Sequence, residues 1–174
     1  MIEETTAVYI TIPGKPVAKN RPRFAKRGKF VTTYSDQETE ESKFYMLARE
    51  QVLKQIKNPL TGPIIVRAIF SFERPKSHYG TGKNAEILKP SALKSYEHTG
   101  KPDVDNCIKF ALDCLNGLAW ADDKQIVSIR IDKQWVQGPG VSRFGIWTMI
   151  PGYNDTGANV ETHDQRWREV FLKP

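Results

Sequence analysis

Four runs of hydrophobic residues along the chain have the pattern of β-strands. Residues 7–12 and 126–131 alternate between apolar and polar positions, which is typical of a half-buried strand. Residues 64–72 are almost continuously apolar and rich in β-branched side chains, which indicates a buried strand. Residues 144–150 have the composition of a last strand.

Two further segments have the spacing of amphipathic helices. Ser35 followed by Glu38 is the pattern of a capping box, so the first helix is expected to begin there and to reach about residue 57. The second is expected over residues 103–116, because Gly117 is a common helix terminator. The predicted fold is therefore α/β of the α+β type, with a mixed β-sheet packed against two main helices. The apolar positions are Phe44, Leu47, Ala48, Val52 and Ile56 in the first helix, and Cys107, Ile108, Ala111, Leu112, Cys114 and Leu115 in the second.

Three segments lie outside this pattern. Residues 13–34 contain prolines and glycines that exclude a long helix and predict a loop or arm. Residues 73–100 have no apolar period, and loops of this length are uncommon unless functional or disordered, so we expect this one to be mobile until DNA binds. Residues 151–174 form a polar extension with a short helical pattern over 164–171. One domain is expected over residues 1–150.

The composition fits a globular domain without a membrane anchor. Of the 174 residues, 39% are hydrophobic and 26% are charged, which is enough to bury a core without structural metal or disulfides. No apolar run is long enough to span a bilayer, and the acidic start at Glu3 and Glu4 lacks the regions of a secretory signal. The cytoplasm is the expected location. Cys107 and Cys114, seven residues apart on one predicted helix, are expected to be reduced core thiols.

Positive charge is concentrated in one segment. The formal net charge is +6, and residues 13–34 contain seven basic residues and no acidic one. Such a segment suits contacts with nucleic-acid phosphates, and Phe24 and Phe30 within it add aromatic surface. A solvated basic loop is the alternative. The basic residues are Lys15, Lys19, Arg21, Arg23, Lys26, Arg27 and Lys29.

Four aspartates flank the second predicted helix. Asp103 and Asp105 open the helix, where an N-cap needs one carboxylate, so the second indicates a cation between them. Asp122 and Asp123 follow the helix and alone would be typical of a turn. A tight return is expected to bring them back beside the helix N-terminus. An oxygen-only cluster of three or four carboxylates predicts Mg²⁺, with Mn²⁺ as a substitute, rather than Zn²⁺.

The remaining residues narrow the chemistry. Lys109 lies one turn beyond the two aspartates, where it could stabilise charge on a phosphate or form a surface salt bridge. The three histidines have no paired ligand spacing, and His98 could be structural or catalytic. No Gly-rich phosphate loop or nucleophile elbow occurs, so no nucleotide cofactor is expected. A metal held by carboxylates, together with the basic segment, therefore predicts metal-assisted hydrolysis of a phosphodiester.

The order of these motifs resembles the RusA family of Holliday junction resolvases, often encoded by phages, over about residues 8–150. The motifs are Lys-Pro-x-x-Lys-x-Arg-Pro-Arg in the basic segment, His-x-x-Lys-Pro-Asp-x-Asp-Asn at the start of the second helix, Leu-Asp-x-Leu-Asn-Gly at its end, and Asp-Asp-x-Gln-Ile before the next strand. Residues 73–100 and the tail are longer than the minimal family pattern, which leaves the substrate preference open.

The resemblance implies a RusA-like fold and a set of roles. Asp103, Asp105 and Asp123 would bind divalent metal with support from Asp122, and Lys109 would assist catalysis. A homodimer would nick two opposed strands of a four-way junction symmetrically in recombination and repair, leaving 5′-phosphates. Apart from the resemblance, we expect Lys101 and the basic segment to contact DNA, where the part around Arg21 and Arg23 could track the junction arms or lie near the dimer partner's site. A less selective flap or branched-DNA endonuclease, and a non-catalytic nucleic-acid-binding protein, are the alternatives.

Overall fold

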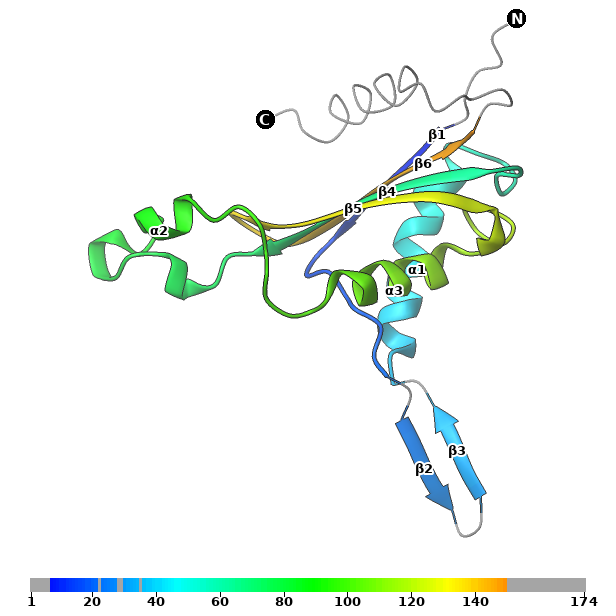
Figure 1. Ribbon diagram of the computed structural model, residues 1–174, viewed down its shortest axis with the longest axis horizontal. Helices are drawn as coiled ribbons and strands as arrows, with labels where there is room; N and C mark the ends of the chain where they lie inside the picture. The colour runs from blue at the N-terminus through cyan, green and yellow to red at the C-terminus, as the bar shows by residue number, and fades with distance from the viewer. Residues whose placement is uncertain (1–6, 22, 28–29, 35, 150–174) are drawn as a thin grey trace, which may run out of the picture.

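The main sheet of the computed structural model, which describes residues 7–21, 23–27, 30–34 and 36–149, is four-stranded. Strands β4 and β5 are parallel, and the other neighbours are antiparallel. The mixed sheet expected from the sequence is therefore confirmed (Figure 1). In order across the sheet the strands are β1 (Ala7–Pro13), β6 (Val141–Thr148), β4 (Ile64–Glu73) and β5 (Ile126–Val136).

Two helices, α1 (Glu38–Leu53) and α3 (Val104–Leu115), lie against one face of this sheet (Figure 1). The central strand β4 turns alternate side chains toward them, so that Val66 and Phe70 are fully buried in the core. Phe44 of α1 packs edge-to-face on Phe110 of α3 at 5.7 Å between ring centroids. Such a pair adds about 0.5–1.5 kcal/mol beyond its buried area, so this contact ties the two helices together.

Helix α1 differs at both ends from the expectation. Its N-cap is Gln37, with no side-chain capping bond, so the predicted capping box is wrong. Gln37 instead donates to the Ala18 carbonyl at 2.8 Å and accepts from the Asn20 amide at 2.6 Å. These bonds attach the chain after β1 to the start of the helix. The helix ends at Leu53, short of the expected residue 57.

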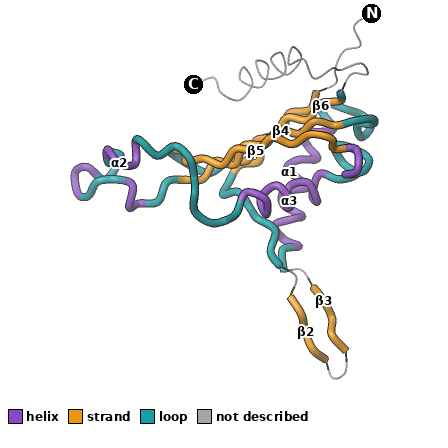
Figure 2. The backbone as a smooth tube through the Cα atoms, in the orientation of Figure 1, coloured by secondary structure: helices purple, strands orange, loops and turns teal. Residues whose placement is uncertain are grey.

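The basic segment contains a hairpin that the sequence pattern did not predict. Strands β2 (Arg23–Arg27) and β3 (Phe30–Tyr34) pair antiparallel, with Arg23 opposite Tyr34. The hairpin extends away from the sheet and both main helices, as the tube representation shows (Figure 2). Residues 13–34 are thus an arm, as expected, but one built partly of strand.

Residues 73–100 form a lobe at one end of the sheet (Figure 1). An isolated bridge between Tyr79 and Leu88 closes it, and another between Glu97 and Gln134 attaches it to the edge of β5. The predicted loop therefore contains short helices and bridges, and its mobility before DNA binding stays a prediction. The lobe contains the short helices η1 (Lys76–His78), η2 (Gly82–Asn84) and α2 (Pro90–Leu93).

Several sequence predictions concern residues outside this description. Residues 151–174, with the proposed short helix, and residue 150 of the predicted last strand belong to this group. In the part of the chain that the structure describes, no helix has the length and apolarity required to cross a membrane.

Both cysteines are buried free thiols, as the sequence indicated. Burial raises the pKa of Cys107 to about 11 and that of Cys114 to about 12. Because only the thiolate reacts readily, we expect neither to be alkylated by iodoacetamide at pH 7.5 in the native protein, and both to react in guanidinium. Mass spectrometry measures this, and fast alkylation of the native protein would contradict the buried positions.

Candidate active site

Asp103 and Asp105 lie at the N-terminus of α3 with exposed side chains. Asp103 is the N-cap residue, yet its side chain makes no capping hydrogen bond. Within the described residues, neither carboxylate has a hydrogen-bonding or ion-pair partner. The simple capping role is therefore not what these two aspartates do. Two free carboxylates beside a helix N-terminus can bind a cation that also bridges to a phosphate.

The backbone leading to these aspartates is held by Lys133 of β5. Its ammonium donates to the carbonyl of Gly100 at 2.6 Å and to that of Pro102 at 2.7 Å. Lys133 pairs with Phe70 across the parallel strands, and therefore lies on the helix-facing side of the sheet. A half-buried lysine with two carbonyl acceptors fixes the segment immediately before Asp103. Lys133 was not predicted from the sequence, although a lone lysine between Ile131 and Trp135 on an otherwise apolar face was a usable signal.

Replacing Lys133 with Met should remove the hydrogen bonds that hold residues 100–102 without creating a cavity in the core. We expect cleavage to fall by about tenfold to a hundredfold, and the Mg²⁺ concentration for half-maximal cleavage to rise, because supporting hydrogen bonds orient metal ligands. Arginine at 133 should restore part of the activity. The exposed Lys54→Met is the control, since among the described residues Lys54 pairs only with Glu50 on the surface of α1. Equal behaviour of the two Met variants would contradict the positioning role.

Lys109 is exposed on α3, as predicted. Its alternative role was a salt bridge to Asp105 or Asp113, but no such pair occurs among the described residues. Asp113 binds Lys19 at 2.9 Å instead. The Lys109 ammonium is therefore available to a ligand one helical turn beyond Asp105.

Asp122 and Asp123 lie at the other end of α3, so the expected convergence within one chain is wrong. The 12-residue helix is about 18 Å long. The turn after it stays at its C-terminal end, where the Gly117 amide donates to the Trp120 carbonyl at 2.8 Å. From Ile126 to Lys133, β5 then runs back about 23 Å before it reaches the segment that precedes Asp103. Accordingly, the described residues contain no cluster of three candidate metal ligands.

Local contacts differ between these two aspartates. Asp122 is the N-cap of η3 (Asp123–Gln125) in a capping box, and its carboxylate accepts from the Lys124 amide at 3.0 Å. This backbone bond, with the Lys124 side chain, lowers the pKa of Asp122. Asp123 is half-buried and accepts from the indole of the fully buried Trp120 at 2.7 Å. Asp122 therefore acts as a turn residue, and Asp123 is an oriented carboxylate with a second oxygen still available.

The basic residues separate into free and engaged groups. Lys15, Arg21 and Lys101 are exposed, as a DNA contact requires. Lys19 is engaged, because its ammonium binds Glu41 at 3.0 Å as well as Asp113. These carboxylates, Asp113 first, raise the pKa of Lys19 against the effect of burial. Lys19 therefore links the basic segment to α1 and α3. The side chains of Arg23, Lys26 and Arg27, on the hairpin, lie outside the described details.

His98 is placed as a structural residue. Its ring is buried and stacks on Trp135 at 3.9 Å between centroids, with Phe72 at 4.5 Å. Burial, with a smaller effect of Lys133, lowers the pKa of His98, so the ring is neutral at pH 7. A neutral, stacked imidazole favours the structural alternative over a catalytic one.

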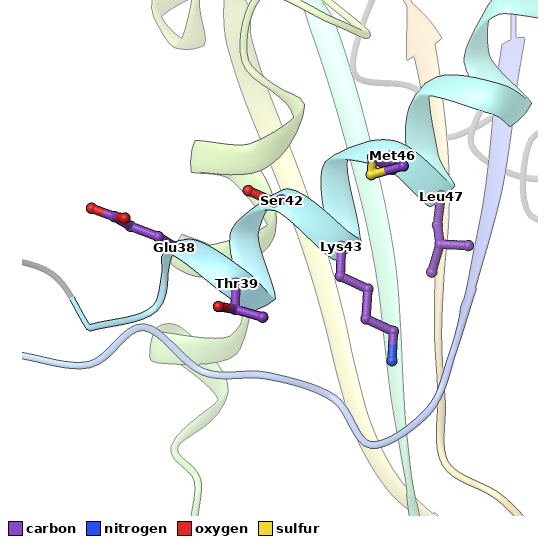
Figure 3. A pocket seen from close by; sticks show the side chains of 6 residues that line it. All are labelled: Glu38, Thr39, Ser42, Lys43, Met46 and Leu47. Atoms are coloured by element: carbon purple, nitrogen blue, oxygen red, sulfur yellow. The ribbon is translucent and has the colours of Figure 1, made fainter.

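The clefts along α1 do not have the features of a nuclease centre. One cleft is lined by residues of α1 alone, and its charged side chains are one carboxylate, Glu38, and one ammonium, Lys43 (Figure 3). The other contains Lys19, Glu41 and Asp113, whose charges are already paired with each other. The candidate chemistry therefore remains at the N-terminus of α3.

Comparisons with known proteins identify the family of the chain. The family model described as Endodeoxyribonuclease RusA matches residues 13–142, which include the arm, the lobe and all four aspartates. The chain is also 31% identical over 136 residues to the "Uncharacterized protein YqaN" of Bacillus subtilis (strain 168), covering 77% of this chain and 92% of that relative.

Proposed function

Because the chain belongs to the RusA family of endodeoxyribonucleases, we propose that it resolves four-way DNA junctions by paired, divalent-metal-dependent nicks that leave 5′-phosphates. The observation that carries the proposal is the pair of free carboxylates at the start of α3, Asp103 and Asp105, held in place through Lys133. Phosphodiester hydrolysis is the chemistry of the family. For this chain we propose four-way junctions as the substrate and paired nicks as the mode of cleavage.

The donor chemistry fits Mg²⁺. The side-chain donors at the start of α3 are oxygens, the carboxylates of Asp103 and Asp105 and the amide of Asn106, and Mg²⁺ is commonly bound by one or two carboxylates together with substrate phosphates and water. Asp103 and Asp105 would hold the ion. When bound, such an ion lowers the pKa of an attacking water and neutralises charge on the leaving oxygen. Manganese has the same ligand preference and should substitute.

A homodimer would complete the set of carboxylates. Each protomer presents Asp103 and Asp105 at one end of α3 and Asp123 at the other. A two-fold axis between antiparallel copies of this region would bring Asp123 of the partner subunit beside the pair. Such a dimer would have two equivalent centres, as two coordinated cuts require.

The edge of the sheet offers a surface for this dimer. Strand β5 is an edge strand, and its first half has no strand partner on the outer side among the described residues. Val127 is 57% exposed and Ile129 is 41% exposed there. Edge strands with exposed apolar side chains commonly pair with a second chain. The strand runs between the two ends of α3, so pairing here would juxtapose the separated aspartates.

The chain's own cations would bind and orient the DNA. Lys109, free on α3, would stabilise negative charge on the scissile phosphate. Lys15, Arg21 and Lys101 would contact the backbone, and Arg23, Lys26 and Arg27 would be carried by the hairpin. A protruding two-stranded ribbon has the dimensions to enter a groove of the duplex. Lys19, already paired with two carboxylates, would support this arm rather than bind DNA.

Cleavage of three labelled substrates tests the junction preference. A four-way junction, a flap and a plain duplex of the same sequences are incubated with Mg²⁺. The proposal expects symmetric cuts in the junction at rates well above those for the flap and duplex. Comparable rates on all three would favour a less selective endonuclease. Tight binding without cleavage, in Mg²⁺ or Mn²⁺, would favour a non-catalytic binding protein.

A further inference from the structure

A pocket of about 570 Å³ lies at the end of the sheet where β1, β4 and β5 end and β6 begins. Its wall is the stack of His98 on Trp135, with Phe72 beside it. The lobe of residues 73–100 supplies one side and the loop after β1 supplies another. This pocket was not predictable from the sequence, because its residues come from five separate parts of the chain.

The pocket is strongly cationic. Four basic side chains line it against the single carboxylate of Glu73. Within the described residues, none of its three lysines forms an ion pair, and all three are exposed. Free ammonium groups around one concave surface attract an anion. The basic residues are Lys15, Arg74, Lys76 and Lys101.

Arg74 gives a second, independent indication of an anion. Its side chain is buried, with the residue only 8% exposed, and its guanidinium donates to the Ser95 carbonyl at 2.7 Å. The other contact of the guanidinium is with the His78 ring at 3.3 Å. No carboxylate of the described residues neutralises it. A buried cation without a counter-ion is costly, and an anion in the pocket would offset that cost.

The pocket also adjoins the candidate cleavage centre. Lys101 precedes Asp103 by two residues, a separation of at most about 7 Å along the backbone. Adjacent phosphates of one DNA strand are joined by six backbone bonds, a span similar to that of two extended residues, so a phosphate next to the scissile one falls within reach. Trp135 is already packed against two rings, His98 stacked on it and His78 edge-on at 5.1 Å between centroids, so we assign recognition of the anion to the basic side chains.

We propose that this pocket binds a backbone phosphate of the DNA strand being cut, one or two nucleotides from the scissile bond, through Lys15, Lys76 and Arg74. The inference rests on the proposed function. It assigns to the lobe, through Arg74 and Lys76, a role in holding the strand in register at Asp103.

The test measures junction binding by the full chain as a function of salt, in EDTA so that cleavage plays no part. Lys76→Ala should weaken binding several-fold and lower the slope of log affinity against log salt by about 1, as the loss of one phosphate contact does. Lys76→Arg should retain the slope. The control is Lys83→Ala, an exposed lysine of the same lobe outside the pocket, which should behave as the unsubstituted protein.

A neutral methylphosphonate placed beside the cut identifies the phosphate. The methylphosphonate should lower the affinity of the unsubstituted protein for the junction, and it should cause no further loss of affinity in the Lys76→Ala variant. Equal salt slopes for Lys76→Ala and Lys83→Ala would overturn the pocket proposal. It would also be overturned if inorganic phosphate stabilised the protein while Lys76→Ala left junction binding unchanged. Failure of the unsubstituted protein to bind any junction would instead overturn the proposed function.

Discussion

Replacing Asp105 with Asn is expected to reduce junction cleavage by at least about a hundredfold while junction binding persists. The amide has the shape of the carboxylate but lacks its charge, and is therefore a poor ligand for a hard cation. Because the Asp105 side chain is exposed and has no partner in the described chain, the substitution should leave the free energy of unfolding nearly unchanged. Cleavage is followed on denaturing gels and binding by fluorescence anisotropy.

The matched control for this variant is Asp132→Asn. Asp132 lies on β5 opposite Ile69, on the sheet face that points away from α3, and its side chain forms a 4.0 Å ion pair with Arg130. Its loss of charge should leave cleavage within about twofold of the unsubstituted protein, as surface substitutions usually do. Metal-stimulated cleavage retained by Asp105→Asn would exclude the carboxylate as a ligand.

A heterodimer of Asp105→Asn with Asp123→Asn should cleave although each homodimer is inactive. If Asp123 of one subunit completes the site of the other, both substitutions fall in one centre of the heterodimer, and the second centre is intact. Nicking should recover to about half the unsubstituted rate, since one of two equivalent sites remains. Co-expression with two affinity tags and tandem purification isolates the heterodimer.

The control heterodimer combines Asp103→Asn with Asp105→Asn. These residues belong to the same helix end, so each centre contains one substitution and no activity should return. An inactive Asp105→Asn with Asp123→Asn heterodimer, beside an active doubly tagged unsubstituted dimer, would show that the aspartates do not act across the interface.

The strands and main helices were predictable because burial leaves a periodic record in the sequence. The apolar alternation of β1 and the continuous run of β4 each mark a strand within two residues of its observed bounds. The hairpin of β2 and β3 shows no such periodicity, since its apolar residues do not alternate with polar ones; they are Phe24, Ala25, Phe30, Val31 and Tyr34. The short helices of the lobe are too brief to show a period.

The site was predictable in its parts but not in its assembly. Asp103 and Asp105 became candidate metal ligands because two carboxylates exceed the needs of one helix cap. The predicted position of Asp123 was wrong. The sequence shows that the chain turns after α3, but it does not show that Asp123 stays at this end of the helix and that β5 then runs back antiparallel to α3. Lys19 likewise pairs with Glu41 and Asp113, which are distant from it in the chain, so no local sequence pattern indicated these ion pairs.

Cleavage of an end-labelled four-way junction with Mg²⁺, compared with the same reaction in EDTA, tests the central claim most directly. Carboxylates that bind a cation beside the DNA require cleavage in Mg²⁺ or Mn²⁺, at symmetric positions with ligatable 5′-phosphates, and none in EDTA. Cleavage that continues undiminished in the chelator, or a tightly bound junction that stays intact in both metals, would contradict it.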